Sequence, residues 1–210
     1  MRLWHCVGAR SLRALWALEE LQLEYELKVL PFPPRVLARE FLEENVLGTV
    51  PYFVHETPSG TVTMTESCAI PHYLASLSGD SSLLLPSDHT EFGSMLNWTY
   101  HADATLTFPQ TIYLRYSALE PDEAKQAVGT DYAKWFIARL RRLDAHLLDH
   151  EYLAGERFTV ADICVGYALY LARELKLSER FKPQTLAYLK RLVEREAFKR
   201  ADGRGRETTD

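Results

Sequence analysis

The chain has 210 residues, a formal net charge of −5, and ordinary proportions of hydrophobic (47%) and charged (25%) residues. The length and composition suit one large domain or two small ones with a hydrophobic core. The negative net charge gives no reason to expect nucleic-acid binding. No apolar run approaches the roughly 20 residues of a membrane span. The three cysteines, Cys6, Cys68 and Cys164, are odd in number and widely spaced. They argue against a disulfide framework and favour a reducing compartment, with the cytoplasm as the default.

The first 77 residues alternate between strand-like and helix-like patterns of hydrophobic residues. Strand, helix, strand, short helix, hairpin and helix are predicted in that order, at residues 2–6, 12–21, 24–29, 39–44, 51–65 and 68–77. The hairpin turn lies at residues 56–60, where Pro58 and Gly60 break the strand pattern. Because a βαβ unit followed by a ββα unit is the order of a thioredoxin-like domain, we expect an α/β domain at residues 1–77.

From residue 89 onward every predicted segment is helical. We expect a linker at 78–88 and an all-α domain at 89–210, and the predicted helices lie near 89–118, 122–149, 160–176 and 184–196. Thr159 and Asp162 predict a capping box at the start of the third of these helices, with Asp as the shorter analogue of the usual Glu. The polar end of the chain from Asp202 onward is expected to be frayed.

The predicted hairpin begins with features of a peptide-binding edge. Pro51 opens its first strand, a position that tolerates a residue without an N–H. A cis Val50–Pro51 bond is a candidate there, because only X-Pro bonds adopt cis at modest cost. That geometry would turn the backbone of Val50 outward, where an extended peptide can pair with it.

Two polar residues, Glu66 and Ser67, come directly before the helix that follows the hairpin. Ser67 is expected at the N-cap, and the free N–H groups of a helix end attract a carboxylate. Glu66 offers a carboxylate for an ammonium group. Together with the backbone edge at Val50, these groups predict a zwitterionic peptide as ligand.

This stretch resembles the glutathione site of cytosolic glutathione S-transferases. The resemblance lies in the pattern Asn-x-x-Gly-x-Val-Pro at residues 45–51, the hairpin that follows it, and Glu-Ser at residues 66–67. The resemblance extends over nearly the whole chain. It implies a thioredoxin-like domain followed by an all-α domain, a cis Val-Pro bond, and glutathione as co-substrate. The implied glutathione-binding residues are Val50, Pro51, Glu66 and Ser67, with Arg35 and His5 as candidates for the glycyl carboxylate.

Ser11 is predicted to be the catalytic residue. It stands at the N-cap of the first helix, where its hydroxyl, the free amides and the positive end of the helix dipole would all meet the glutathione sulfur. A hydrogen bond to a charged group contributes about 1.5–3 kcal/mol, and one pKa unit corresponds to about 1.4 kcal/mol. Such a donor would lower a thiol pKa of about 8.5 by roughly one to two units, which makes the thiolate common at neutral pH. The alternative is that Ser11 only caps the helix.

The start of the chain also resembles the bacterial beta class, in which Gly-Ala-Cys-Ser is usual. Arg10 stands at the cysteine position here, so a mixed disulfide with glutathione at this residue is impossible and a serine-type site is expected. Arg10 either lends positive charge to a thiolate or an acidic substrate, or is a solvated loop residue. A backbone amide is a further candidate for stabilising the sulfur.

Two other patterns suggest different chemistry. Cys6 is a competing nucleophile, but a cysteine in a strand is more often a small core residue. His146 and His150 have the spacing of a zinc-binding helix, but no third ligand cluster accompanies them. We therefore expect no metal.

The second substrate is expected to bind along the long helix at residues 89–118. In the family this helix faces the glutathione domain across a cleft and also forms part of the dimer interface. Aromatic and polar side chains that share a helix face predict a pocket for a small hydrophobic electrophile. The predicted pocket residues are Arg10, Tyr100, Asp103, Thr107, Phe108 and Tyr113. Ordinary packing between helices is the alternative at each position.

The resemblance thus implies a cytoplasmic, homodimeric glutathione transferase of detoxification, without nucleic-acid or membrane partners. It would activate the glutathione thiol as thiolate for attack on small hydrophobic electrophiles. One alternative is a glutathione-dependent isomerase, dehalogenase or ether-cleaving lyase that acts on a specific metabolite. Another is a transferase-like binding module without turnover.

Overall fold

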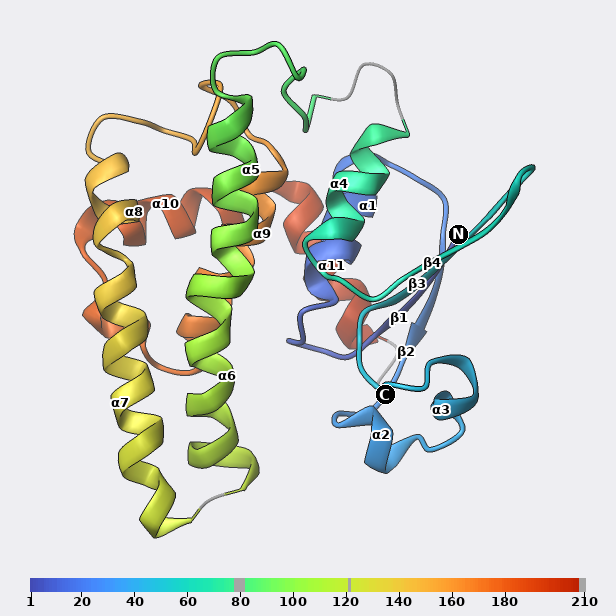
Figure 1. The fold of residues 1–210 in the computed structure, drawn as a ribbon, viewed down its shortest axis with the longest axis horizontal. Coiled ribbons are helices and arrows are strands. Elements are labelled where there is room, and N and C mark those ends of the chain that lie inside the picture. Colours follow the sequence, from blue (N-terminus) through green and yellow to red (C-terminus); the bar gives the residue numbers. More distant parts are fainter. Residues whose placement is uncertain (78–81, 121, 208–210) are drawn as a thin grey trace. The chain divides into compact units, whose positions relative to one another are not determined.

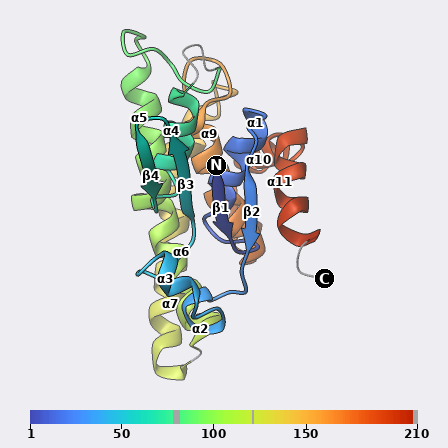
Figure 2. The ribbon, with the colours of Figure 1, turned by 90° about the vertical axis from the view of Figure 1, so that its right-hand side faces the viewer.

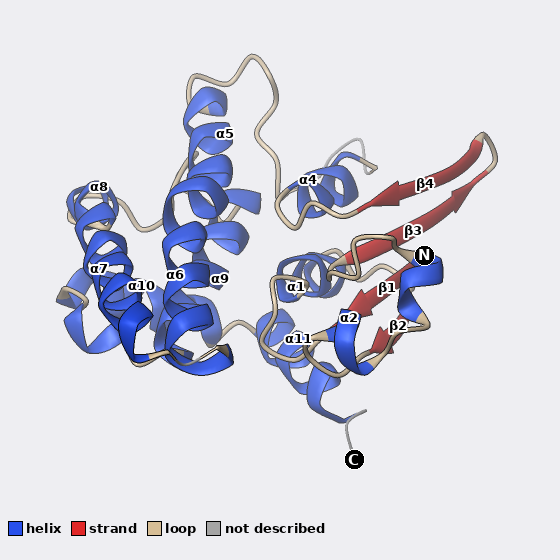
Figure 3. Cartoon of the chain, turned by 60° about the horizontal axis from the view of Figure 1, so that its bottom comes forward, coloured by secondary structure: helices blue, strands red, loops and turns tan. Residues whose placement is uncertain are grey.

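The computed structural model describes residues 1–77, 82–120 and 122–207. The chain divides into two compact units, of which unit 1 comprises Met1–Leu84 with Glu194–Asp210 and unit 2 comprises Leu85–Val193. Among the described residues, the strands all lie in unit 1, whereas unit 2 is helical (Figure 3). This confirms the expected fold class, a thioredoxin-like α/β domain with an all-α domain. Residues 78–81 of the predicted linker lie outside the described residues.

Unit 1 is built on a four-stranded sheet with the strand order β2-β1-β3-β4 (Figure 2). The strands are β1 Arg2–His5, β2 Glu26–Val29, β3 Tyr52–Thr57 and β4 Gly60–Met64. β1 pairs in parallel with β2 and antiparallel with β3, and β3 and β4 form the predicted hairpin. Leu3, at the centre of β1, is fully buried and pairs with Leu27 on one side and Phe53 on the other.

The helices of unit 1 are α1 Leu12–Glu20, α2 Pro34–Leu37, α3 Phe41–Glu44, α4 Ala69–Ser76 and α11 Glu196–Glu207. α1 is buried on every side and contacts β1, α4 and α11. Its apolar side chains Leu15, Trp16 and Leu18 are inaccessible to solvent. The ring of Trp16 packs edge-on against Phe198 of α11, with 4.9 Å between the ring centroids.

The C-terminal segment differs from its prediction. The chain from Asp202 onward was expected to fray, and residues 194–210 were assigned to the helical domain. Instead α11 continues to Glu207 and packs on α1 within unit 1, with Ala201 and Gly205 buried. Arg195, just before α11, pairs with Glu20 of α1, and Arg200 of α11 pairs with Glu19, so the polar sequence forms a docked helix.

Unit 2 is a bundle whose longest helical stretch runs without a break through four segments. These are α5 Phe92–His101, the π-helical η1 Ala102–Thr107, α6 Phe108–Leu114 and the π-helical η2 Arg115–Leu119. The helix α7 Glu123–Arg139 runs back alongside α6, and α8 Arg141–His146 follows, so residues 122–149 form two helices where one was predicted (Figure 1). The remaining segments are α9 Val160–Glu174, the short 3₁₀ helix η3 Ser178–Arg180 and α10 Pro183–Val193.

The central helix of unit 2 is α9, most of whose residues are buried. The capping box at its start is confirmed: the backbone N–H of Thr159 donates to Oδ2 of Asp162 at 2.8 Å. The other carboxylate oxygen of Asp162 accepts from the N–H of Leu153 at 3.1 Å and from the hydroxyl of Tyr188 at 2.7 Å. Asp162 therefore joins the start of α9 to α10 as well as capping it.

Candidate functional site

The segment that leads into β3 forms the backbone edge that the sequence predicts. Asn45 is buried and stabilises the turn. Its side-chain Nδ2 donates to the backbone carbonyl of Thr49 at 2.9 Å, and its backbone carbonyl accepts from the N–H of Gly48 at 2.8 Å. The Val50–Pro51 bond is cis, as expected. Within the described residues, no hydrogen bond reaches the backbone N–H or C=O of Val50. Both groups are therefore available to an extended ligand.

Arg35 of α2 lies directly beside this turn. Gly48 has a φ of +57°, and a Cβ added to it would lie 2.7 Å from the Cβ of Arg35. Glycine is thus required twice at this position, by the left-handed backbone and by the close approach of α2. The side chain of Arg35 is exposed next to the edge, whereas His5, the other candidate for the glycyl carboxylate, is buried within unit 1. Of the two candidates, only Arg35 is accessible to a carboxylate from solvent.

Glu66 and Ser67 precede α4, but not in the predicted geometry. α4 begins at Ala69 with Cys68 at its N-cap, so the prediction that Ser67 occupies this position is wrong. Glu66 is exposed, and Ser67 is only 4% exposed. The Oγ of Ser67 accepts a hydrogen bond of 2.8 Å from the guanidinium of Arg13, a buried residue of α1 that sequence reasoning did not single out. Nothing in the local sequence around either residue indicates this pairing.

Ser11 occupies the predicted N-cap of α1, but its hydroxyl does not point toward the helix amides. It makes no side-chain cap, and the residue is 0% exposed. Its Oγ accepts from the N–H of Cys6 at 3.3 Å and lies 2.9 Å from Nδ1 of His5. The amides of Leu12 and Arg13 already donate to carbonyls of the preceding turn, so the hydroxyl instead finds its partners at His5 of β1 and at Cys6, the residue after it. The predicted orientation is therefore wrong, whereas the catalytic role of Ser11 stays a prediction.

The two residues beside Ser11 are held in their neutral forms. Burial lowers the pKa of His5 to about 4, with the carboxylate of Asp202 acting in the opposite direction. Burial raises the pKa of the Cys6 thiol to about 12, and its Sγ lies 3.6 Å from the carbonyl of Pro31. Because a thiolate is the reactive form of cysteine, Cys6 at neutral pH is a packing residue of the strand end.

The predicted electrophile residues of unit 2 do not share one face. Tyr100 and Phe108 are 62% and 46% exposed, and Asp103 and Tyr113 are half-buried. Thr107 is 0% exposed and donates its hydroxyl to the carbonyl of Ala102 at 2.7 Å, so the prediction that it lines a pocket is wrong. The π-helical turn of η1 shifts the positions that follow it relative to an α-helix, which a 3.6-residue period does not anticipate. Arg10, the remaining tentative residue, is half-buried in the loop before α1 of unit 1.

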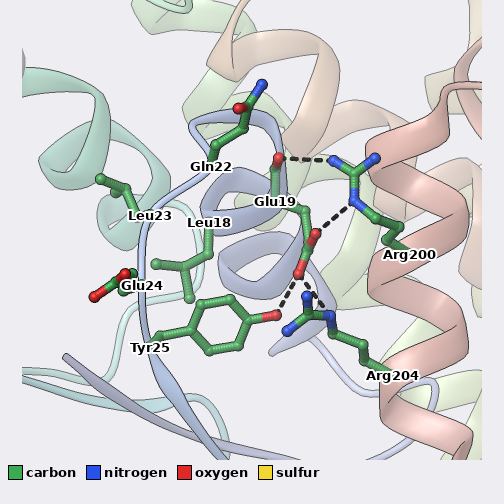
Figure 4. A pocket seen from close by; sticks show the side chains of 8 residues that line it. All are labelled: Leu18, Glu19, Gln22, Leu23, Glu24, Tyr25, Arg200 and Arg204. Carbon is green, nitrogen blue, oxygen red and sulfur yellow. Dashed lines mark hydrogen bonds and ion pairs between the residues drawn. The ribbon is translucent and has the colours of Figure 1, made fainter.

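A surface pocket of about 610 Å³ in unit 1 lies between α1 and α11 (Figure 4). Its lining consists of Leu18, Glu19, Gln22, Leu23, Glu24, Tyr25, Arg200 and Arg204. Arg200 and Arg204 both pair with the carboxylate of Glu19, at 2.7 and 3.0 Å, and the hydroxyl of Tyr25 donates to it. Burial raises the pKa of Glu19, but the Tyr25 hydroxyl and the two guanidinium groups outweigh it and hold this pKa below its ordinary value. These charges satisfy one another and fasten α11 to α1.

The two histidines with zinc-like spacing stack on each other, with 4.4 Å between the ring centroids. Nε2 of His146 lies 2.9 Å from the carbonyl of Tyr152, and Nδ1 of His150 lies 2.8 Å from the carboxylate of Glu156. In the described parts of the chain, no group of three or more His, Cys, Asp or Glu side chains is placed to hold a metal ion. No helix among the described residues is long and apolar enough to span a membrane.

Comparison with known proteins identifies the family. The model of the glutathione S-transferase N-terminal domain matches residues 1–76, and that of the glutathione S-transferase C-terminal domain matches residues 102–196. The chain is 28% identical to glutathione S-transferase 3 of Schizosaccharomyces pombe over 85% of this chain and 76% of that protein. It is 27% identical to glutathione S-transferase GstA of Escherichia coli O157:H7 over 93% and 94% of the two chains.

A solved structure agrees with this assignment. The chain superposes with a TM-score of 0.79 and 25% identity on a glutathione transferase family member from Pseudomonas fluorescens, covering 95% of this chain and 91% of that one. That protein was solved with two glutathione bound. The two domain matches, the full-length relatives and the fold therefore show that the chain belongs to the glutathione S-transferase family.

Proposed function

We propose that unit 1 binds glutathione along the edge before β3 and that the enzyme transfers it to small hydrophobic electrophiles. The observation that carries this proposal is the backbone of Val50, whose N–H and C=O make no hydrogen bond among the described residues. Pro51 fixes the end of this edge. The ammonium of the γ-glutamyl end binds Glu66, its carboxylate binds Ser67, and the glycyl carboxylate binds Arg35. Each group of the tripeptide thus has a partner of the right chemistry.

The thiolate is stabilised at the loop before α1, and we assign the direct role to Arg10. The hydroxyl of Ser11 is buried and already bonded to His5 and Cys6, whereas Arg10 is half-buried at the same helix end. An opposite charge within about 4–6 Å lowers the pKa of an acid by about 1–3 units. A guanidinium at this place therefore favours thiolate over thiol. The Ser11 hydroxyl stabilises the loop through its contacts with His5 and Cys6.

Two variants separate these roles. Arg10→Gln is expected to raise the pKa of bound glutathione, measured by the ultraviolet absorbance of the thiolate against pH, and to lower the rate of conjugation with an aryl halide. Ser11→Ala is expected to lower stability and leave the thiol pKa near that of the unsubstituted enzyme. A rise in thiol pKa in Ser11→Ala as large as that in Arg10→Gln would return the direct role to the Ser11 hydroxyl.

Binding itself is tested by thermal unfolding with increasing glutathione. A ligand at a hundred times its Kd stabilises the folded state by about 2.7 kcal/mol, so the melting temperature should rise with concentration. Glu66→Gln should reduce the shift, whereas Glu43→Gln, an exposed carboxylate of α3, should not. The absence of any shift at millimolar glutathione would instead favour the alternative of a binding module without turnover.

The remaining expectations belong to the same proposal. The electrophile contacts exposed side chains of α5 and α6, of which Tyr100 and Phe108 are the most accessible predicted ones. Asp103 and Tyr113, both half-buried, are secondary candidates. We further propose a cytoplasmic homodimer that acts in detoxification. Size-exclusion chromatography with light scattering tests the dimer, and a screen of aryl halides, hydroperoxides and β-ether compounds tests the substrate class.

A further inference from the structure

The carboxylate of Glu19 is the point at which α11 is fastened to α1. Its side chain is only 6% exposed. Nε of Arg200 lies 2.7 Å and Nε of Arg204 lies 3.0 Å from its two oxygens, and the Tyr25 hydroxyl donates to it as well (Figure 4). Arg200 also donates to the backbone carbonyl of Glu19 at 3.1 Å. Because hydrogen bonds between ionised groups are about twice as strong as neutral ones, this carboxylate is a strong anchor for α11.

The place of Glu19 in its helix makes these partners necessary. Glu19 and Glu20 are the last two residues of α1, where the negative end of the helix dipole disfavours a carboxylate. Glu20 is paired in the same way, since Nε and Nη2 of Arg195 donate to its two oxygens at 2.6 and 2.9 Å. A buried carboxylate is stable only when it is paired, so the end of α1 depends on the arginines that come with α11.

The other end of α11 covers the imidazole of His5. Gly205 is buried, and a Cβ added to it would lie 2.6 Å from Nε2 of the ring, so the helix approaches more closely than a side chain would allow. His5 itself is 1% exposed. The carboxylate of Asp202, also in α11, acts electrostatically on the ring. α11 therefore forms one wall of the space that holds His5.

The second ring nitrogen of His5 faces the loop that carries Arg10. Nδ1 lies 2.9 Å from Oγ of Ser11, and the same oxygen accepts from the N–H of Cys6 at 3.3 Å. The N–H of Ala9 in turn donates to the carbonyl of Cys6 at 3.0 Å. These contacts close the loop onto the end of β1. Because Arg10 directly precedes Ser11, its place depends on how firmly His5 and Ser11 are held.

We infer that Glu19 is a positioning residue for the glutathione site: by fastening α11 it holds the His5 ring against Ser11 and so fixes the loop that carries Arg10. This inference rests on the proposed function, because it assumes that glutathione binds at this loop. It makes the docking of α11 and the binding of glutathione two coupled equilibria. If docking raises the affinity for glutathione by some factor, bound glutathione must favour docking by the same factor.

Hydrogen exchange followed by mass spectrometry measures the docking of α11 without reference to activity. Glu19→Gln keeps the shape of the side chain and removes its charge. Exchange of the amides in residues 196–207 and in residues 6–13 should become roughly ten- to a hundredfold faster, the effect of losing a hydrogen bond to a charged group. Glu24→Gln is the matched control and should exchange like the unsubstituted enzyme, because Glu24 lines the same pocket, is exposed, and points away from Glu19 in Figure 4.

Isothermal titration of glutathione separates positioning from a merely structural role. Glu19→Gln should bind glutathione more weakly than the unsubstituted enzyme, whereas Glu24→Gln should bind it equally well. Bound glutathione should slow exchange in residues 196–207 of the unsubstituted enzyme by about fivefold or more, the low end of the usual range for coupled sites.

Two results would overturn the inference. One is exchange of α11 that does not respond to saturating glutathione. The other is unchanged affinity in a Glu19→Gln enzyme whose α11 exchanges faster. If the unsubstituted enzyme bound no glutathione at all, the proposed function itself would fail, and the inference with it.

Arg200→Gln tests the same pair from its exposed side and takes the place of Glu19→Gln if that variant does not fold. The Arg200 side chain is 46% exposed, and Glu19 keeps a guanidinium partner in Arg204. Lys199→Gln is its control, because this lysine pairs with Glu196 within α11. Faster exchange of α11 and weaker glutathione binding in Arg200→Gln alone would support the inference, and equal effects of both substitutions would refute it.

Discussion

Gly205 lies on the buried face of α11, against the imidazole of His5 in β1. A Cβ added to it would lie 2.6 Å from Nε2 and 3.2 Å from Cδ2 of the ring. His5 has little freedom to withdraw, because its other ring nitrogen lies 2.9 Å from the Ser11 hydroxyl. Gly205→Ala should therefore push α11 away from β1 or disturb the pair of His5 and Ser11.

Two opposing effects determine the size of this change. Overpacking a buried site costs about 1–3 kcal/mol, whereas alanine in place of a helical glycine stabilises by about 0.5–1 kcal/mol. We expect a net destabilisation of about 1–2 kcal/mol, since the contact involves a ring that is held on its far side. Urea unfolding followed by circular dichroism measures it as a lower midpoint at unchanged slope.

Gly203→Ala is the matched control in the same helix. A Cβ at this position would meet no atom within 4 Å. Only the gain in helix propensity applies, so this variant should be more stable by about 0.5–1 kcal/mol. Equal stabilisation by both substitutions would show that α11 does not pack on His5, and the interpretation of unit 1 as including the last helix would be refuted.

Three further outcomes follow from the buried groups. The pKa of His5 lies at about 4 in the folded state and at its ordinary 6.5 in the unfolded state. The unfolded state therefore binds the proton first as pH decreases, and the free energy of unfolding should fall by about 3 kcal/mol between pH 6.5 and pH 4. The pH dependence of the urea midpoint measures this fall, and His5→Gln should flatten it. Tyr188→Phe removes the 2.7 Å hydrogen bond to the buried carboxylate of Asp162 and should cost about 1.5–3 kcal/mol in urea unfolding; a loss below about 0.5 kcal/mol, the level of an ordinary surface change, would contradict the contact. Cys6, whose thiol pKa burial raises to about 12, should resist a thiol reagent at pH 8 until the protein unfolds, and labelling of Cys6 in the native protein would mean that the strand end opens.

The turn before β3 was predictable because its signals are local. The order of strands and helices follows from hydrophobic periodicity, and the turn before β3 follows from Asn45, Gly48 and Pro51 within seven positions. The capping box of Thr159 and Asp162 is equally local, since its two members are three residues apart. Where a structural feature depends on neighbours in sequence, the residue types alone carry the information.

The interior of the candidate site depends on how the chain folds back between its strands and helices, and there the local signals were insufficient. Ser11 has the residue type and position of a helix cap, but the turn between β1 and α1 brings its hydroxyl back to His5 and to the N–H of Cys6. Arg13 reads as an ordinary polar position of a helix, and only the approach of α4 shows that Ser67 is its partner. The polar C-terminal segment became a docked helix for the same reason, through its arginines and the carboxylates of α1.

The amino-acid sequence by itself therefore determined the family, the two kinds of domain and the turn with the cis Val50–Pro51 bond before β3. The tertiary structure decided which polar side chains are exposed and which are buried. The physical reason is that a polar group can be buried only with a hydrogen-bond partner, and the partner of the buried Arg13 is Ser67, which lies 54 residues away in the sequence and is brought close only by folding.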